Sequence, residues 1–217
     1  QAELDKILQQ YAQNQKIDLL CGGSQKAVSA PPGLTFVVVS DDAKEKMKNR
    51  KTPIASFYAN LMAFDGYYEK KWFPYTMPIS DIYGLRAAFN LIAGDKTLYE
   101  RHARIGSATR AAVKEAGLKL HLQSGYSNTV TVFDIPECTD AKSILDEMRT
   151  KYNIMLAGSF DELSGKVIRI GHMGENARLE HMVPALEALS ATLTDLGVTL
   201  QGNLADLFLK HYREFQD

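Results

Sequence analysis

The sequence predicts an α/β chain with two parts, residues 1–95 and residues 96–217. Two short apolar runs before residue 40 are typical of strands, and helical spacing of apolar residues then continues up to Gly94. Beyond this point the pattern changes, since several short strand-like runs alternate with amphipathic helices. That order of elements is typical of a small α+β unit.

Local signals place the elements of the first part. Pro31 and Pro32 exclude a helical crossover between the two strands, so we expect these strands to be antiparallel and their long connection to be functional. The expected order is a helix over 3–14, strands over 17–20 and 34–39, a helix over 42–51 that Ser40 and Asp41 cap, an irregular aromatic-rich segment over 52–78, and a helix that Ser80 caps and Gly94 ends.

The second part is expected to mix four strands with four helices. The strands are predicted over 118–122, 129–133, 154–157 and 167–170, and the helices over 97–117, 140–151, 175–196 and from Asn203 onward.

Composition excludes several classes of protein. The chain has 217 residues, a net charge of −1 and no basic run interleaved with aromatic residues, so neither nucleic acid nor a membrane surface is an expected partner. Its two cysteines, Cys21 and Cys138, form no CxxC pair, which argues against a disulfide scaffold or a structural zinc site. With no signal-peptide pattern at the start of the sequence, we expect a cytoplasmic protein.

Lys26 lies in the connection between the two predicted strands, in GGSQKAVSAPPG, where turn chemistry does not require a lysine. Apolar surroundings would remove water from the amine and favour its neutral form, which is the nucleophile in Schiff-base chemistry. The neighbouring Ser24 and Gln25 can hydrogen-bond an anionic group. Lys26 is therefore a candidate nucleophile, and the alternative is a loop lysine that faces water.

Arg169 lies between two isoleucines in KVIRIGHMG, inside a predicted strand. A guanidinium in such a position needs an anionic partner or an open cleft. Its planar fork suits a carboxylate held by two parallel hydrogen bonds. Binding of a substrate carboxylate and a structural ion pair are both open at this point.

Thr76 in YTMPIS precedes a predicted helix, so its hydroxyl is either a helix cap or a ligand for a phosphate oxygen. The five histidines show no ligand spacing such as HExxH, so no metal site is predicted. We expect His172 to be a surface or satisfied core residue, with a position facing the cleft of Arg169 as the alternative. A nucleophilic lysine and a carboxylate-binding arginine together favour an enzyme that acts on amino acids through a carbonyl cofactor.

The stretch GGSQKAVSAPPGLTFVVVS resembles the cofactor-lysine segment of the class V aminotransferases, in particular the alanine:glyoxylate and serine:pyruvate aminotransferase group. The resemblance continues through SDDAKEKMKNRKTPIASFY, YTMPISDIYGLRAAFNLI and GKVIRIGHMGENAR, in the order of that family. It implies the fold of a fold-type I transferase, with residues 1–95 as the C-terminal portion of the large domain that binds the cofactor and residues 96–217 as the small C-terminal domain.

The resemblance also assigns roles to individual residues. It implies that Lys26 forms a Schiff base with pyridoxal 5'-phosphate, that Gln25 lies against this cofactor, and that Thr76 reaches the cofactor phosphate of the neighbouring subunit in a homodimer. Arg169 matches the arginine that holds the substrate α-carboxylate. The family carries a tyrosine three positions before the threonine, whereas this sequence has Phe73 there and Tyr75 next to Thr76.

The implied reaction is transamination between a small amino acid, alanine or serine, and a keto acid, glyoxylate or pyruvate. Family members carry another half-chain before this point, with the acidic partner of the pyridine nitrogen and the phosphate loop. We therefore expect this chain to be the C-terminal half of such an enzyme and to be inactive alone. Two alternatives are an inactive fragment that only self-associates and a desulfurase or lyase of the same class. Desulfurases usually carry a histidine before the lysine and a cysteine on a mobile loop, whereas this chain has Gln25, and Cys138 lies in a PECTD turn.

Overall fold

The computed structural model describes residues 14–215. The chain divides into two compact units at the Gly94–Asp95 peptide bond. The helix predicted over residues 3–14 lies almost wholly outside the described residues. No helix among the described residues combines the length and the apolar character needed to cross a bilayer.

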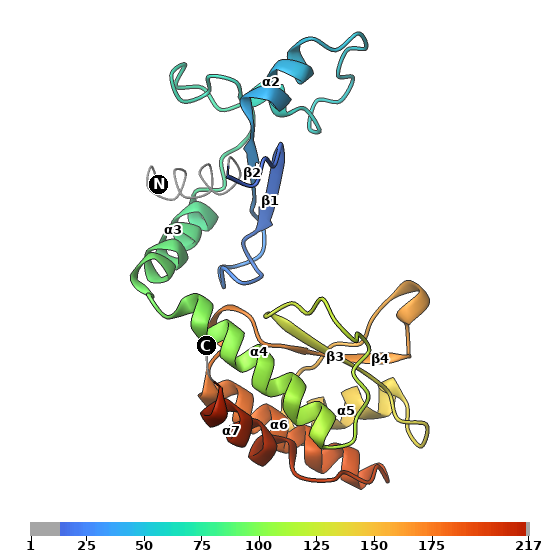
Figure 1. Cartoon of the computed structure of the whole chain (residues 1–217). Coiled ribbons are helices and arrows are strands. Elements are labelled where there is room, and N and C mark those ends of the chain that lie inside the picture. Colours follow the sequence, from blue (N-terminus) through green and yellow to red (C-terminus); the bar gives the residue numbers. More distant parts are fainter. Residues whose placement is uncertain (1–13, 216–217) are drawn as a thin grey trace. The chain divides into compact units, whose positions relative to one another are not determined.

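The first unit, which ends at Gly94, is built around a pair of strands. Strands β1 and β2 pair in antiparallel register from Leu19 opposite Val39 to Gly23 opposite Thr35, which confirms the predicted direction. Figure 1 shows these strands with the helices that follow them. The elements of this unit are β1 (Leu19–Gly23), β2 (Thr35–Val39), α2 (Asp41–Lys48), the 3₁₀ helix η1 (Leu61–Phe64) and α3 (Ile79–Gly94).

The first strand continues further than the sequence suggests, because it includes two glycines that rarely occupy strand interiors. The structure explains Gly22 by close approach of a ring: a Cβ atom added there would lie 2.1 Å from Cε2 and Cζ of Phe36 on the partner strand. Phe36 in turn packs edge-on against Phe89 of α3, with 5.9 Å between ring centroids. The glycine therefore allows one aromatic ring to join the strand pair to the helix.

The two helices of the first unit begin in different ways. The Ser40 hydroxyl accepts the Ala43 amide at 3.0 Å and caps α2, as predicted. The predicted cap at Ser80 is wrong, because α3 begins one residue earlier at Ile79. The carbonyl of Pro78 already accepts the Ile82 amide at 3.0 Å, which places Ser80 inside the first turn.

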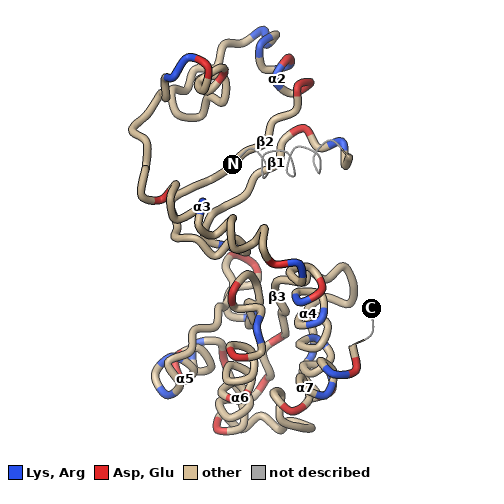
Figure 2. Tube along the Cα trace, turned by 90° about the vertical axis from the view of Figure 1, so that its left-hand side faces the viewer, with Lys and Arg blue, Asp and Glu red and all other residues tan. Residues whose placement is uncertain are grey.

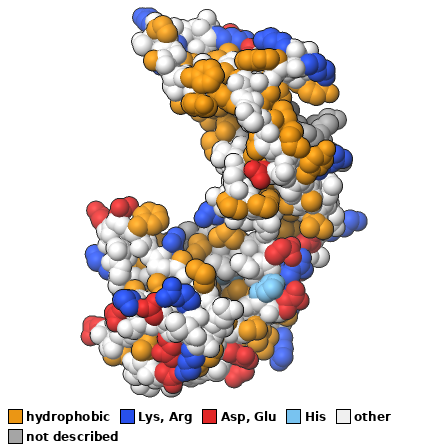
Figure 3. All heavy atoms as spheres, turned by 180° about the vertical axis from the view of Figure 1, so that it is seen from behind, with side chains coloured by type: hydrophobic (Ala, Val, Ile, Leu, Met, Phe, Trp, Pro, Cys, Tyr) orange, Lys and Arg blue, Asp and Glu red, His pale blue; other side chains and the backbone are white. Residues whose placement is uncertain are grey.

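Little of the first unit is buried. Among its described residues, the buried apolar side chains are the alanines Ala30, Ala43 and Ala88. Large apolar side chains face outward, and Figure 3 shows them over the surface of this unit. These exposed residues are Leu19, Val37, Phe57, Tyr58, Leu61, Tyr67, Tyr68, Trp72, Met77, Ile79, Tyr83 and Leu91. Apolar surface of this extent is typical of a face that another chain or segment covers.

The second unit, from Asp95 onward, is a small α+β fold. Its elements are α4 (Leu98–Glu115), β3 (Val130–Asp134), α5 (Ala141–Tyr152), the 3₁₀ helix η2 (Asp161–Leu163), β4 (Val167–Gly171), the 3₁₀ helix η3 (Gly174–Asn176), α6 (Leu179–Asp195) and α7 (Leu204–Glu214). Helix α7 packs against both α4 and α6 (Figure 1). Figure 2 shows charged residues along α4 and α7, whereas α6 carries acidic residues and no Lys or Arg.

Two of the four strands predicted for this unit are wrong. Residues 118–122 and 154–157 each form a single bridge, Leu120 with Phe133 and Ala157 with Arg169. Leu118 and Leu120 are nearly fully buried. The alternation of apolar and polar residues over 118–122 therefore reflects packing on the core more than pairing in a β-sheet. The helix predicted over 175–196 begins later, at Leu179, after the separate 3₁₀ turn η3.

The core of the second unit lies between its helices and the strand pair. Ile105 of α4, Phe133 of β3, Ile168 of β4, Leu189 of α6 and Phe208 of α7 have no exposed surface. Full burial of each such side chain contributes roughly 1.5–3 kcal/mol relative to exposure. The strand that carries Arg169 is therefore a fixed element of this core.

Candidate functional site

The connection between β1 and β2 is closed at its base by Ser24, which has no exposed surface. Its hydroxyl donates to the Pro31 carbonyl at 2.6 Å and accepts the Leu34 amide at 3.3 Å. Its backbone N–H donates to the Leu34 carbonyl at 3.0 Å, and its carbonyl accepts the Ala30 amide at 2.9 Å. One buried serine thus joins both ends of the loop that presents Lys26.

Lys26 lies in the turn that directly follows Ser24, and both Lys26 and Gln25 are exposed. Its carbonyl accepts the Ser29 amide at 2.9 Å, and Ser29 has the left-handed backbone with φ 58° that this tight turn requires. Apolar surroundings, one of the two alternatives for this lysine, are not found among the described residues, and its exposure agrees with the alternative of a loop lysine that faces water. The amine forms no ion pair with a carboxylate of residues 14–215, so it is accessible and unpaired within them.

Thr76 is exposed and lies shortly before the start of α3. Its hydroxyl makes no hydrogen bond to the described residues and does not cap the helix, so the helix-cap alternative is not supported. An exposed hydroxyl in this position remains available to a phosphate oxygen.

Aromatic rings hold the segment before Thr76. The Tyr75 hydroxyl donates to the Phe57 carbonyl at 2.7 Å, so this side chain supports the segment and does not point freely to solvent. Phe73 packs within the same group of rings. The group consists of Phe57, Tyr58, Phe64, Tyr67, Phe73 and Tyr75, with 5.1–6.3 Å between the centroids of contacting rings.

Arg169 occupies the middle of β4, opposite Val132 of β3. Its Nε–H donates to the Gly158 carbonyl at 2.5 Å, and its guanidinium carbon lies 5.8 Å from the ring centroid of Phe160. No carboxylate among residues 14–215 forms an ion pair with it. The structural ion pair left open by the sequence is therefore not found within the described chain, and the Nη atoms are available to an anion.

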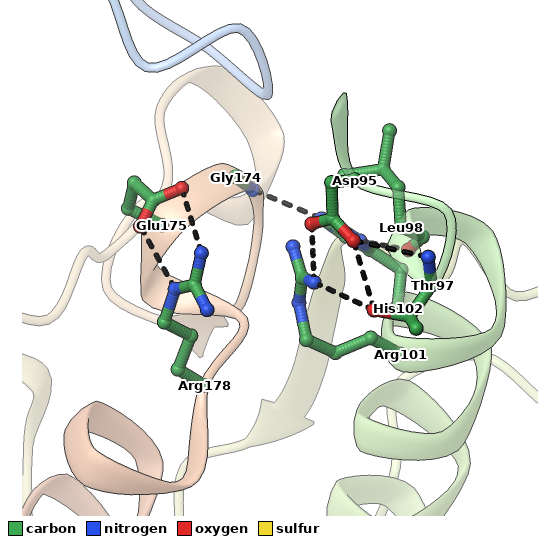
Figure 4. Close-up of polar contacts among 8 residues, drawn as sticks. All are labelled: Asp95, Thr97, Leu98, Arg101, His102, Gly174, Glu175 and Arg178. Atoms are coloured by element: carbon green, nitrogen blue, oxygen red, sulfur yellow. Dashed lines mark hydrogen bonds and ion pairs between the residues drawn. The ribbon is translucent and has the colours of Figure 1, made fainter. Parts of the chain in front are cut away.

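The loop that follows β4 is attached to the start of α4 by a polar network, drawn in Figure 4. His102 donates from Nδ1 to the Leu98 carbonyl at 2.7 Å and accepts the Gly174 amide at Nε2, 2.9 Å away. Accepting that amide requires the neutral ring with its proton on Nδ1. His102 thereby ties the end of the arginine-bearing strand to the helix.

The remaining contacts of Figure 4 surround this histidine. Asp95 accepts hydrogen bonds from Arg101 at 2.5 Å and from the Thr97 hydroxyl at 2.8 Å, and these bonds lower the pKa of Asp95 to about 2. Glu175 and Arg178 form a separate pair, with 2.8 Å between Oε2 and Nε. The sequence did not indicate this network, because the bond that joins its two parts, from Gly174 to His102, spans 72 positions.

His172 is a core residue that faces no cleft. It is fully buried, its Nε2 accepts the Thr131 hydroxyl at 2.8 Å, and its Nδ1 donates to the Asn128 carbonyl at 3.2 Å. Burial lowers the pKa of His172 to about 4. The expectation of a satisfied core histidine is confirmed, and the alternative position beside Arg169 is wrong.

This buried histidine predicts how stability depends on pH. In the unfolded chain His172 binds a proton below its usual pKa of about 6.5, whereas the folded chain resists protonation until pH about 4. The contribution of neutral His172 to the free energy of unfolding is therefore fully present above pH 6.5. It is lost between pH 6.5 and 4, which lowers the free energy of unfolding by on the order of 3 kcal/mol. Denaturant unfolding at several pH values, followed by circular dichroism, measures this loss.

The matched variants are His172→Gln and His181→Gln. His172→Gln is expected to flatten the decline between pH 6.5 and 4, whatever its cost at pH 7. His181 is exposed, so His181→Gln is expected to keep the decline. An unchanged slope in His172→Gln would show that another group causes it.

The four residues singled out by the sequence divide between the units. Gln25, Lys26 and Thr76 belong to the first unit, and Arg169 belongs to the second. Within the first unit, Gln25 and Lys26 share one turn. The contacts of Gly158, Phe160 and His102 were not anticipated. A backbone carbonyl that accepts from Arg169, a ring contact and a histidine hydrogen bond across 72 positions leave no local pattern in the sequence.

Known proteins similar to this chain include several aminotransferases. The family model for aminotransferase class V matches residues 7–157. Serine–glyoxylate aminotransferase of Arabidopsis thaliana is 36% identical over 90% of this chain and 50% of its own length. Pyridoxamine–pyruvate transaminase of Mesorhizobium japonicum is 34% identical over 84% of this chain and 48% of its own length.

The fold is shared with the same class of protein. The crystal structure of ureidoglycine–glyoxylate aminotransferase from Bacillus subtilis matches with a TM-score of 0.86 and 30% identity, over 93% of this chain and 54% of that one. This likeness confirms the predicted α/β fold of a fold-type I transferase. The chain spans about half the length of the curated relatives it matches. It belongs to the class V aminotransferase family.

Proposed function

We propose that this chain supplies the cofactor lysine and the substrate-binding arginine of a pyridoxal-phosphate-dependent aminotransferase. The proposed reaction moves an amino group between a small amino acid, alanine or serine, and a keto acid, glyoxylate or pyruvate. The observation that carries the proposal is Lys26, an accessible and unpaired amine on a loop closed by a buried serine, in a chain of this family. The relatives act, by their names, on glyoxylate or pyruvate.

The residues present fit pyridoxal 5'-phosphate, the cofactor that the family implies. An aldehyde requires an unpaired amine, which Lys26 offers, and a phosphate requires hydroxyl or amide donors. Gln25 is exposed beside the lysine, and the exposed hydroxyl of Thr76 has no other partner among the described residues. We assign Lys26 and Gln25 to cofactor binding, and Thr76 to the phosphate of a neighbouring subunit.

Two side chains of this chain would act on the substrate. The bound cofactor supplies an electron sink for the amino acid. Lys26, once its amine is free, would take the proton from Cα as a general base. It would then deliver this proton to the cofactor carbon as a general acid. Arg169 would hold the α-carboxylate with two parallel hydrogen bonds and so fix which Cα bond is broken.

In this proposal the first unit is the C-terminal portion of the large domain that binds the cofactor, and the second unit is the small C-terminal domain. We also propose a homodimer in the cytoplasm. The outward apolar side chains of the first unit support an assembly, and the two free cysteines fit a reducing compartment. Sedimentation equilibrium tests the dimer, which a monomeric mass at high concentration would exclude.

An assay of the full-length protein loaded with pyridoxal 5'-phosphate tests the function. We expect alanine or serine to lose its amino group to glyoxylate or pyruvate, with glycine or alanine as the measured product. Cysteine is the control substrate, because sulfide release would indicate the desulfurase alternative that the comparisons do not favour. Sulfide release without amino transfer would overturn the proposal.

A further inference from the structure

A short segment lies along the outer side of β4 at the position of Arg169. The backbone of Ala157 accepts the Arg169 amide at 2.7 Å and donates to the Arg169 carbonyl at 3.3 Å. The segment then continues to Gly158 and Phe160, which precede η2 (Asp161–Leu163). This pairing fixes the position of residues 158–160 along β4 relative to the arginine side chain.

Two contacts from this segment constrain the guanidinium. The Gly158 carbonyl accepts Nε–H at 2.5 Å, and the ring centroid of Phe160 lies 5.8 Å from Cζ. The first contact occupies one edge of the planar group, and the second lies within the range in which an aromatic ring attracts a cation. The described residues make no hydrogen bond to Nη1 or Nη2.

Packing in the core does not explain why an aromatic residue occupies position 160. Its side chain is 69% exposed, although large apolar residues are usually buried. A free arginine side chain carries about 2 kcal/mol of rotamer entropy, which any ligand that immobilises it must overcome. A ring beside the guanidinium removes part of that cost before the ligand arrives.

We propose that Phe160 is a positioning residue that holds Arg169 with its Nη1–Nη2 edge directed at the substrate carboxylate. The inference rests on the proposed function, since it assigns the carboxylate to Arg169. Because Nε is engaged by Gly158, the carboxylate binds end-on through the two Nη atoms. Amino acid and keto acid share this carboxylate, so both depend on Phe160.

The test compares Phe160→Leu, which keeps an apolar side chain without a ring, with Phe160→Tyr, which restores the ring. Met155→Leu is the control, because Met155 lies on the neighbouring stretch and is 83% exposed with no ring to offer. The first measurement is exchange of the Arg169 Nε–H with water, followed by NMR on the 217-residue chain. The second is KM and kcat for alanine and for glyoxylate in the full-length protein loaded with cofactor.

We expect Phe160→Leu to accelerate Nε–H exchange and to raise both KM values about two- to fivefold with kcat unchanged, which is the effect of one exposed cation–π contact. Phe160→Tyr and Met155→Leu should match the unsubstituted chain in both measurements. Unchanged exchange in Phe160→Leu overturns the inference, and so does faster exchange with unchanged KM. Absence of turnover in the unsubstituted full-length protein overturns the proposed function instead, and the exchange measurement then still decides whether Phe160 holds the guanidinium.

Discussion

Replacement of Lys26 by alanine is expected to lower kcat for amino transfer by about 10³-fold or more. The amine would serve both as the covalent anchor of the cofactor and as the group that moves the Cα proton, and general acid–base catalysis alone contributes about 10²–10⁴-fold. Lys26 is exposed. The hydrogen bonds of Ser24 that close its loop do not involve the lysine side chain. The substitution should therefore leave the fold intact.

Steady-state rates with alanine and glyoxylate measure this effect, and circular dichroism checks the fold. Lys51→Ala is the matched control, since Lys51 is an exposed lysine of the same unit and should retain full activity. Lys26→Arg keeps the positive charge without a nucleophilic amine, so it should be as inactive as Lys26→Ala. Activity within tenfold of the unsubstituted protein in Lys26→Ala would remove the lysine from the mechanism.

Replacement of Arg169 by lysine is expected to raise KM for both the amino acid and the keto acid by about 10- to 100-fold. A lysine keeps the charge but cannot present two parallel donors, and a lost hydrogen bond to a charged group costs about 1.5–3 kcal/mol. The lysine would also lose the bond from Nε to the Gly158 carbonyl. The smaller effect of Phe160→Leu should be absent in the Arg169→Lys background, because the ring would no longer have a guanidinium to hold.

The same kinetic assay separates binding from chemistry here. Arg149→Lys is the control, because Arg149 is an exposed arginine of α5 that pairs with Asp146 and should show unchanged constants. A fall in kcat with no change of KM in Arg169→Lys would mean that the arginine does not bind the ground-state carboxylate.

The sequence predicted those elements that local chemistry determines. Ser40 followed by a charged helix, and the two prolines between the β1 and β2 strands, act on their own neighbours, and both predictions are confirmed. Ser80 failed as a cap because α3 begins one residue earlier, at Ile79, where the Pro78 carbonyl already accepts the Ile82 amide. The run 118–122 failed as a strand because burial on the core and pairing in a sheet produce the same alternation.

The site was predictable in its residue types but not in its surroundings. Arg169 in an apolar strand signalled an anion-binding group, yet its contacts with Gly158 and Phe160 arise only when a separate segment pairs with β4. For Lys26 the sequence left open apolar surroundings or a position that faces water, and the structure shows it exposed. Burial depends on every surface near the lysine, which no short motif specifies.

Chemical mapping of the cofactor lysine tests the central claim most directly. The protein is incubated with pyridoxal 5'-phosphate, reduced with borohydride, digested and examined by mass spectrometry. The account predicts one phosphopyridoxyl group per chain, on the peptide that contains Lys26, and none on that peptide in Lys26→Ala. A label located on another lysine, or spread over exposed lysines such as Lys51, would contradict it.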